Sequence, residues 1–270
     1  MRQVLAAAKI NLALVVGPLR EDEKHEVATV LQRVDLADRV SVTTADRLEV
    51  TGFAEDTLVR RALEGLAAAA GVEARFAARI DKRIPVAAGL GGGSSDAAAA
   101  LRLANELLPQ PLAAGELRRL AAELGSDCPF FLASGPQLGT GDGSELTQLE
   151  LPQDYFVLLV LPEGARKVST AEIYGHFDER GGGRGFEERR AQLERALASV
   201  THEGDLAALP PNDLASSPLA ADLRGLGAFR ADVSGAGPVV FGLFFHHRQA
   251  KVACSALRGR GQVWLTAPAW

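Results

Sequence analysis

The sequence predicts a two-domain α+β protein, and three observations support this prediction. A strand-like segment, a glycine-rich loop and a helix-favouring run follow one another between residues 75 and 108. The second half alternates strand-length apolar runs with helical segments, in an order typical of an antiparallel sheet covered by helices. A chain of 270 residues has the length of one large or two modest domains. We place the boundary near Pro152, which gives domains 1–152 and 153–270.

The composition argues against several classes of protein. The net charge of −5, without a basic stripe, argues against a nucleic-acid partner. The two cysteines, Cys128 and Cys254, indicate no disulfide framework and favour a cytoplasmic location. The histidines have no metal-ligand spacing with cysteine, so we expect no metal centre held by the protein alone. The longest apolar runs have the length of strands, so we expect no membrane span.

Two polar side chains interrupt the first predicted strand. Alternation along this strand places Lys9 and Asn11 on the same face of an otherwise apolar segment. Such groups need partners, unless this is an edge strand with Lys9 in water. The elements expected in the first half are strands at 4–16, 27–34, 39–43, 48–51, 75–84 and 145–151, and helices at 57–70, 94–108 and 115–124.

The second half contains one low-complexity stretch, from Arg180 to Gly185, which predicts a flexible loop. Around it, apolar runs and helical periodicity predict a sheet and its covering helices. The expected strands are 155–162, 229–234, 239–245 and 263–266, and the expected helical segments are 170–174, 186–200, 212–226 and 249–257.

The strongest functional signal is the glycine-rich loop with its flanks. Its glycines allow a positive φ and close approach of a ligand to the backbone, and the N-terminus of the following helix favours an anion such as phosphate. Neither the Walker loop nor the dinucleotide fingerprint fits, because Gly93 is followed by serine. The alternative is a flexible linker capped by Ser94 or Ser95. The segment reads Pro85, Val86, Ala87, Ala88, Gly89, Leu90, Gly91, Gly92, Gly93, Ser94, Ser95 and Asp96.

A second signal is the turn Gly125-Ser126-Asp127-Cys128-Pro129-Phe130-Phe131, in which a carboxylate directly precedes an apolar run. Taken alone, this pattern favours Asp127 as the cap of the next element.

Four motifs, in their order along the chain, resemble those of the GHMP small-molecule kinases. They resemble most the branch that phosphorylates the 2-hydroxyl of 4-diphosphocytidyl-2-C-methyl-D-erythritol in the non-mevalonate isoprenoid pathway. The resemblance covers nearly the whole chain. It implies the two-domain GHMP kinase fold, with an N-terminal mixed α/β ATP-binding domain and a C-terminal antiparallel sheet covered by helices. The motifs are Lys9-Ile10-Asn11-Leu12, residues 85–96, residues 125–131 and Ser234-Gly235-Ala236-Gly237-Pro238.

The resemblance also implies roles for single residues. Asp127 would accept the proton of the acceptor alcohol, and Lys9 would pair with it and stabilise the transferring phosphoryl group. The loop from Pro85 to Ser95 would wrap the ATP phosphates, with Mg²⁺ on the nucleotide and Ser94 or Ser95 as a candidate ligand. A small cytidine diphosphate substrate would contact Asn11, His25, Thr170 and Tyr174, with the segment around His25 binding the cytosine and Tyr174 stacking on the other face of that base.

The chain also departs from the family pattern. The family's Gly-Tyr before the histidine is replaced by Glu23-Lys24, so one stacking aromatic is lost. Asp-Asn-Leu near the nucleotide reads Asp56-Thr57-Leu58, and Ala-Pro-Ala-Lys reads Ala6-Ala7-Ala8-Lys9. Two alternatives therefore stay open: a GHMP kinase for homoserine or a mevalonate derivative, and a non-catalytic nucleotide-binding protein. The sequence does not set the oligomeric state.

Overall fold

The computed structural model describes residues 2–165 and 169–270 and divides into two compact units that are interleaved along the chain. The domains 1–152 and 153–270, expected from the order of strands and helices, follow a different division and remain a prediction. Unit 1 consists of Met1–Ala8, Leu36–Val86 and Gly91–Ser134, and unit 2 of Lys9–Asp35, Ala87–Leu90 and Gly135–Trp270.

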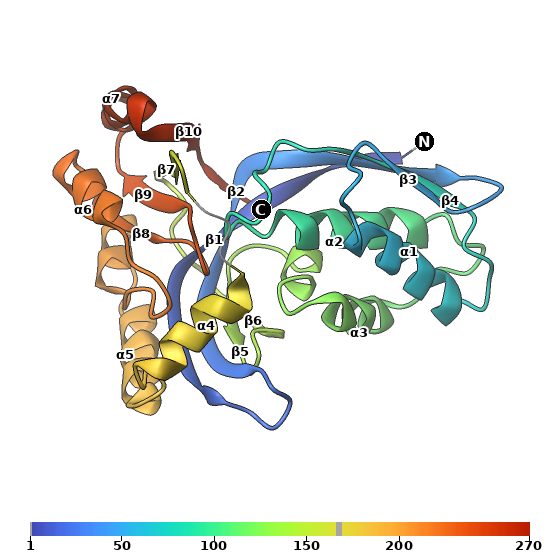
Figure 1. The fold of residues 1–270 in the computed structure, drawn as a ribbon, viewed down its shortest axis with the longest axis horizontal. Helices are drawn as coiled ribbons and strands as arrows, with labels where there is room; N and C mark the ends of the chain where they lie inside the picture. Colours follow the sequence, from blue (N-terminus) through green and yellow to red (C-terminus); the bar gives the residue numbers. More distant parts are fainter. Residues whose placement is uncertain (1, 166–168) are drawn as a thin grey trace. The chain divides into compact units, whose positions relative to one another are not determined.

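Three helices and a set of strands form unit 1. The helices α1 (Leu58–Ala69), α2 (Gly92–Asn105) and α3 (Ala114–Leu124) pack side by side, with β3 (Glu49–Thr51) and β4 (Phe76–Asp81) along them (Figure 1). The apolar side chains of α1 recur at helical spacing and are buried, so one face of α1 joins the core. The unit also contains the short 3₁₀ helix η1 (Pro129–Leu132).

Unit 2 contains a four-stranded antiparallel sheet. Its strand order is β10 (Gly261–Thr266), β7 (Phe156–Pro162), β9 (Val240–Phe244) and β8 (Arg230–Val233). The helices α6 (Pro218–Gly225) and α7 (His247–Leu257) share one hydrophobic core with these strands. The remaining helices are α4 (Thr170–Glu179), α5 (Phe186–Ala198), η2 (Glu203–Ala208) and η3 (Arg258–Arg260).

A seven-stranded sheet is built on two long strands, β1 (Arg2–Leu19) and β2 (His25–Thr44), each of which contributes residues to both units. Its path is β3-β4-β2-β5-β6, and β1 and β11 also pair with β2. The α+β class and the two types of sheet confirm the predicted fold class. The short strands are β5 (Gln137–Thr140), β6 (Glu145–Gln148) and β11 (Pro268–Ala269).

Several predicted boundaries were wrong. The strands expected at 27–34 and 39–43 are one strand, because the polar stretch between them stays extended and the Asp38 carboxylate is buried. The helical region expected from Asn212 begins only at Pro218.

The stretch from Arg180 to Gly185 forms hydrogen-bonded turns, and Arg189 donates to the carbonyl oxygens of Gly182 and Arg184. Val168, predicted before α4, lies outside the described residues.

In the part of the chain that the structure describes, none of the helices combines the length and the apolar character that crossing a membrane requires.

Candidate active site

The first half of the glycine-rich loop is fixed by its carbonyl oxygens. The carbonyl of Ala88 accepts from Val239 N at 3.2 Å and that of Leu90 from Lys9 N at 2.9 Å. The Gly89 carbonyl accepts from Ser234 Oγ at 2.8 Å. In a planar trans peptide, the N–H of the next residue points away from the carbonyl. Anchoring these carbonyls therefore directs the N–H groups that follow them away from the residues that hold the carbonyls, as an anion-binding loop requires.

Two of the loop glycines are required by the backbone itself. Gly89 has φ +80°, and a Cβ there would lie 2.1 Å from the Ser234 carbonyl oxygen. Gly91 has φ +67° and stands at the N-cap position of α2. Ala87 also has a positive φ, of 52°, although it carries a side chain. Such strain is retained mainly where the surrounding structure fixes it, often at functional sites.

The helix α2 begins at Gly92, two residues before the predicted start at Ser94, and ends at Asn105 instead of Leu108. Gly92 and Gly93 therefore form the first turn of the helix, whose N–H groups have no intrahelical partners. This places the triple glycine at the positive end of the helix dipole.

A buried charge cluster lies beneath this first turn, within unit 1. Lys82 Nζ donates to Asp38 at 2.5 Å and to Asp96, on α2, at 2.8 Å. The Asp38 carboxylate also accepts from the backbone N–H groups of Arg83 and Ile84, where β4 leads into the loop. The cluster thus joins the residues entering the loop to the helix leaving it. A Cβ at Gly92 would lie 3.2 Å from Lys82 Nζ, so the ammonium group lies against the helix start.

Asp96 differs from Asp38 in its hydrogen bonding. Its Oδ1 is buried and has no hydrogen-bond partner among the described residues. Burial, and then the charge of Asp38, raise the pKa of Asp96 to about 7, against the opposing effect of Lys82. A proton on Asp96 leaves the cluster with one carboxylate for one ammonium, which lowers the cost of burying it.

Lys9 and Asn11 lie together on β1, as the alternation predicted. Lys9 Nζ donates to Asn11 Oδ1 at 2.7 Å, and each residue is only 4% exposed. The edge-strand alternative, with Lys9 in water, is therefore wrong. Gly235 packs against both: a Cβ there would lie 3.3 Å from Asn11 Oδ1 and 3.5 Å from Lys9 Nζ. Asn212 holds this glycine by donating to its carbonyl oxygen at 2.7 Å.

The segment with Asp127 lies in unit 1 and is tied to the end of the loop. The side chain of Cys128 hydrogen-bonds to that of Ser94. Burial raises the pKa of the Cys128 thiol to about 11, so this cysteine is not a nucleophile at neutral pH. The N-cap position of η1 belongs to Cys128 and not to Asp127. Since Lys9 is in unit 2, its pairing with Asp127 stays a prediction.

The two residues predicted at the cytosine lie together in unit 2. The rings of His25 and Tyr174 have centroids 4.6 Å apart and an interplanar angle of 31°. A base between two rings needs two contact distances of roughly 3.5 Å each. In this arrangement the space between the two rings is too small for a base. The side chain of His25 also hydrogen-bonds to Asp178 at 2.9 Å. Thr170, predicted to bind substrate, is the first residue of α4.

The altered turn before His25 contains a residue with positive φ. Glu23, which stands where the family has glycine, has φ +62°. An L-residue in this left-handed region costs roughly 1–2 kcal/mol. Lys24, in place of the family's tyrosine, forms an ion pair with Asp142. Glu23 therefore has a backbone conformation that glycine adopts with less strain.

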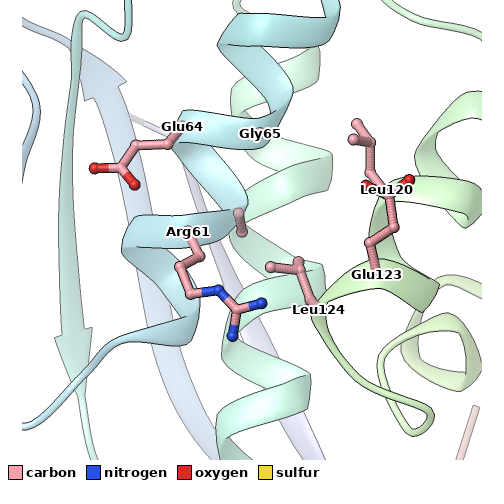
Figure 2. Close-up of a pocket in the computed structure, with 7 residues that line it drawn as sticks. Arg61, Glu64, Gly65, Leu120, Glu123 and Leu124 are labelled. Carbon is pink, nitrogen blue, oxygen red and sulfur yellow. The ribbon is translucent and has the colours of Figure 1, made fainter.

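A pocket of about 210 Å³ lies between α1 and α3 in unit 1. Figure 2 shows that α1 contributes Arg61, Glu64 and Gly65 and that α3 contributes Leu120, Glu123 and Leu124. None of the residues predicted from the sequence lines it. This pocket therefore has no part in the candidate active site.

Neither Lys82 nor Asp38 was predicted from the sequence as part of the site. Lys82 and Asp38 are 44 positions apart, and their pairing follows from the pairing of β2 with β4. No local pattern marks such a contact. Ser234 was noted within a motif, but its role in holding Gly89 follows only from the structure.

Comparisons with known proteins agree on one family. The family model described as "GHMP kinases N terminal domain" matches residues 57–135. A 4-diphosphocytidyl-2-C-methyl-D-erythritol kinase from Anaeromyxobacter sp. (strain Fw109-5) is 42% identical, over 92% of this chain and 83% of the relative. A kinase of the same name from Desulfitobacterium hafniense (strain Y51) is 37% identical, over 98% of this chain and 94% of the relative.

Solved structures show the same relationship. A crystal structure of 4-(cytidine 5'-diphospho)-2C-methyl-D-erythritol kinase is similar with a TM-score of 0.80 and 31% identity, covering 100% of both chains. A mevalonate kinase structure has a TM-score of 0.77 at 14% identity, covering 99% of both chains, and shows the shared fold alone.

The buried cluster predicts a pH-dependent stability difference between the protein and its Asp96→Asn variant. The pKa of Asp96 is raised from the ordinary 3.8 to about 7 in the folded protein. The stability that Asp96 contributes is therefore complete below pH 3.8 and is lost as the pH rises through about 7. We expect the free energy of unfolding of the wild type, minus that of the variant, to fall by at most about 1.4 kcal/mol per pH unit over this range. Urea unfolding at several pH values measures it, and a constant difference would contradict the assignment.

The strained turn predicts that Glu23→Gly stabilises the protein by about 0.5–1 kcal/mol, because relief of left-handed strain exceeds the added entropy of the unfolded chain. The matched control is Glu23→Ala, which removes the same carboxylate but keeps the Cβ. Urea unfolding midpoints should rise for the glycine variant only. Equal midpoints for both variants would show that the charge, and not the backbone, determines the effect.

Proposed function

Since the chain belongs to the family of the 4-diphosphocytidyl-2-C-methyl-D-erythritol kinases, within the GHMP kinases, we propose that it transfers the γ-phosphoryl group of ATP to the 2-hydroxyl of that cytidine diphosphate. This step belongs to non-mevalonate isoprenoid precursor biosynthesis. The observation that supports the proposal most is 42% identity over 92% of the chain to a kinase of this name. Lys9, Asp127 and the glycine-rich loop, the motifs on which phosphoryl transfer would depend, are all present.

The nucleotide phosphates would bind at the loop. Its carbonyls at Ala88, Gly89 and Leu90 are anchored, so the N–H group that follows each of them would point away from its anchor. The first turn of α2 would add its own N–H groups. Among the described residues, no three His, Cys, Asp or Glu side chains are grouped to hold a metal. That suits Mg²⁺, which binds ATP through phosphate oxygens and water with few protein ligands. Ser94 or Ser95 would supply a hydroxyl ligand.

The chemistry would then require a base and a cation. The oxygen of the 2-hydroxyl would attack the γ-phosphorus of ATP while Asp127 accepts the hydroxyl proton. The bond between the γ-phosphorus and the β-phosphate oxygen would break, which releases ADP. The ammonium of Lys9, held by Asn11, would offset the charge on the transferring group. Positioning the two reactants in line contributes much of the rate enhancement in such reactions.

The acceptor would be recognised through its cytosine. The His25–Tyr174 pair offers an aromatic surface, and base stacking contributes about 1–3 kcal/mol. Asn11 and Thr170 are proposed to contact the rest of the substrate. This recognition separates the proposed function from the two alternatives, since neither homoserine nor a mevalonate derivative carries a base.

The test is an ADP-release assay with 4-diphosphocytidyl-2-C-methyl-D-erythritol, homoserine and mevalonate as separate acceptors. We expect the cytidine diphosphate to give a kcat/KM at least about 100-fold above the other two, because only it gains the stacking energy and its phosphate contacts. A kcat/KM for homoserine or mevalonate above that for the cytidine diphosphate would contradict the proposed substrate, but not the proposed kinase activity.

Asp127→Asn is the control for catalysis in this assay. Its turnover should fall at least about 1,000-fold through loss of the base and its charge, while ADP affinity measured by calorimetry stays within about threefold of the wild type. Nucleotide binding without ADP release from the wild-type protein, for any acceptor, would favour the non-catalytic alternative.

A further inference from the structure

A chain of three buried hydrogen bonds ends at the ammonium of Lys9, within unit 2. Thr29 Oγ, on β2, donates to the carbonyl oxygen of Ala13 at 2.8 Å. Asn11 Nδ2 donates to Thr29 Oγ at 2.8 Å, and Lys9 Nζ donates to Asn11 Oδ1 at 2.7 Å. Lys9, Asn11 and Thr29 are each 4% exposed.

The direction of this chain is determined by its far end. A carbonyl oxygen can only accept, so the single proton of the Thr29 hydroxyl goes to Ala13. Thr29 Oγ is then left to accept, and only the NH₂ end of the Asn11 amide can donate to it. The opposite end of that amide, its oxygen, must face Lys9.

The reversed amide would be unfavourable at both of its contacts. Its NH₂ group would face the Lys9 ammonium, and both of these groups are donors. Its oxygen would face the Thr29 oxygen, whose only proton is donated to the Ala13 carbonyl. In a buried position, unpaired polar groups of this kind are costly. Thr29 therefore selects the orientation of Asn11 in which Asn11 can hold Lys9.

We propose that Thr29 is a positioning residue, which fixes the place of the Lys9 ammonium by orienting the amide of Asn11. The inference rests on the proposed function, in which Lys9 stabilises the transferring phosphoryl group. Thr29 itself touches neither reactant in this account. Its effect should appear in the rate of the chemical step more than in binding of the substrates, since a displaced catalytic group lowers turnover.

Two variants separate the hydroxyl of Thr29 from its methyl group. Cγ2 of Thr29 packs near Gly139, where a Cβ would lie 3.2 Å from it. Thr29→Val keeps this packing and removes the hydroxyl, whereas Thr29→Ser keeps the hydroxyl and removes the methyl group. We expect kcat of Thr29→Val to fall about 10- to 100-fold, with KM for ATP within about threefold of the wild type. Thr29→Ser should retain at least about half of the wild-type kcat.

A double-mutant cycle with Asn11→Asp tests the orientation directly. A carboxylate presents oxygen at both ends, so its orientation does not matter to Lys9. In the Asn11→Asp background, Thr29→Val should therefore lower kcat by less than about threefold. A kcat of Thr29→Val within twofold of the wild type would overturn the proposal. An equal loss of kcat in Thr29→Val and Thr29→Ser would also overturn it. So would an equal effect of Thr29→Val on kcat in the wild-type and Asn11→Asp backgrounds.

A measurement that does not use the reaction keeps the proposal separate from the proposed function. The side-chain amide signal of Asn11 in a ¹⁵N–¹H NMR spectrum can be assigned by its disappearance in Asn11→Asp. We expect Thr29→Val to shift this signal and Thr29→Ser to leave it nearly in place. If the wild type releases no ADP while the signal shifts, the proposed function fails and the hydrogen-bond chain stands. If the signal does not move in Thr29→Val, the chain is refuted even where ADP is released.

Discussion

The site depends first on how the backbone of the glycine-rich loop is held. Strand β1 donates to the Leu90 carbonyl through Lys9 N, and the residue before β9 donates to the Ala88 carbonyl. Ser234 donates to the carbonyl between them, that of Gly89. A flexible glycine loop would lose much of its binding energy in becoming ordered. Here the hydrogen bonds order it before a ligand arrives, which is the physical meaning of preorganisation.

Strand β1 and the turn between β8 and β9, which hold the loop, also position the side chain of Lys9. Lys9 holds Leu90 with its backbone and Asn11 with its side chain. The turn that carries Ser234 brings Gly235 against Lys9 and Asn11. A shift of this turn would therefore move the glycine-rich loop and the ammonium group together. Any substitution in it should be judged on both effects.

The sequence predicted the parts of this site that are local and missed those that depend on strand pairing. Neighbouring residues carry the glycine loop, and simple alternation brings Lys9 and Asn11 to one face, so both were found. Lys82 reaches Asp38 only because β4 pairs with β2, and Thr29 reaches Asn11 across the pairing of β1 with β2. No spacing in the sequence marks these contacts. The continuity of β2 was missed because a buried carboxylate such as Asp38 looks like a loop residue until its donors are known.

The central claim is that the anchored loop presents its N–H groups to the phosphates of a nucleotide. The most direct measurement is an NMR titration of the ¹³C,¹⁵N-labelled protein with MgADP and, separately, with adenosine, with the loop glycine signals assigned by triple-resonance spectra. We expect the amides of Gly89, Gly91, Gly92 and Gly93 to shift strongly with MgADP and little with adenosine, because phosphate is the group they would bind. Equal shifts with both ligands, or shifts with MgADP confined to glycines outside the loop, would contradict it.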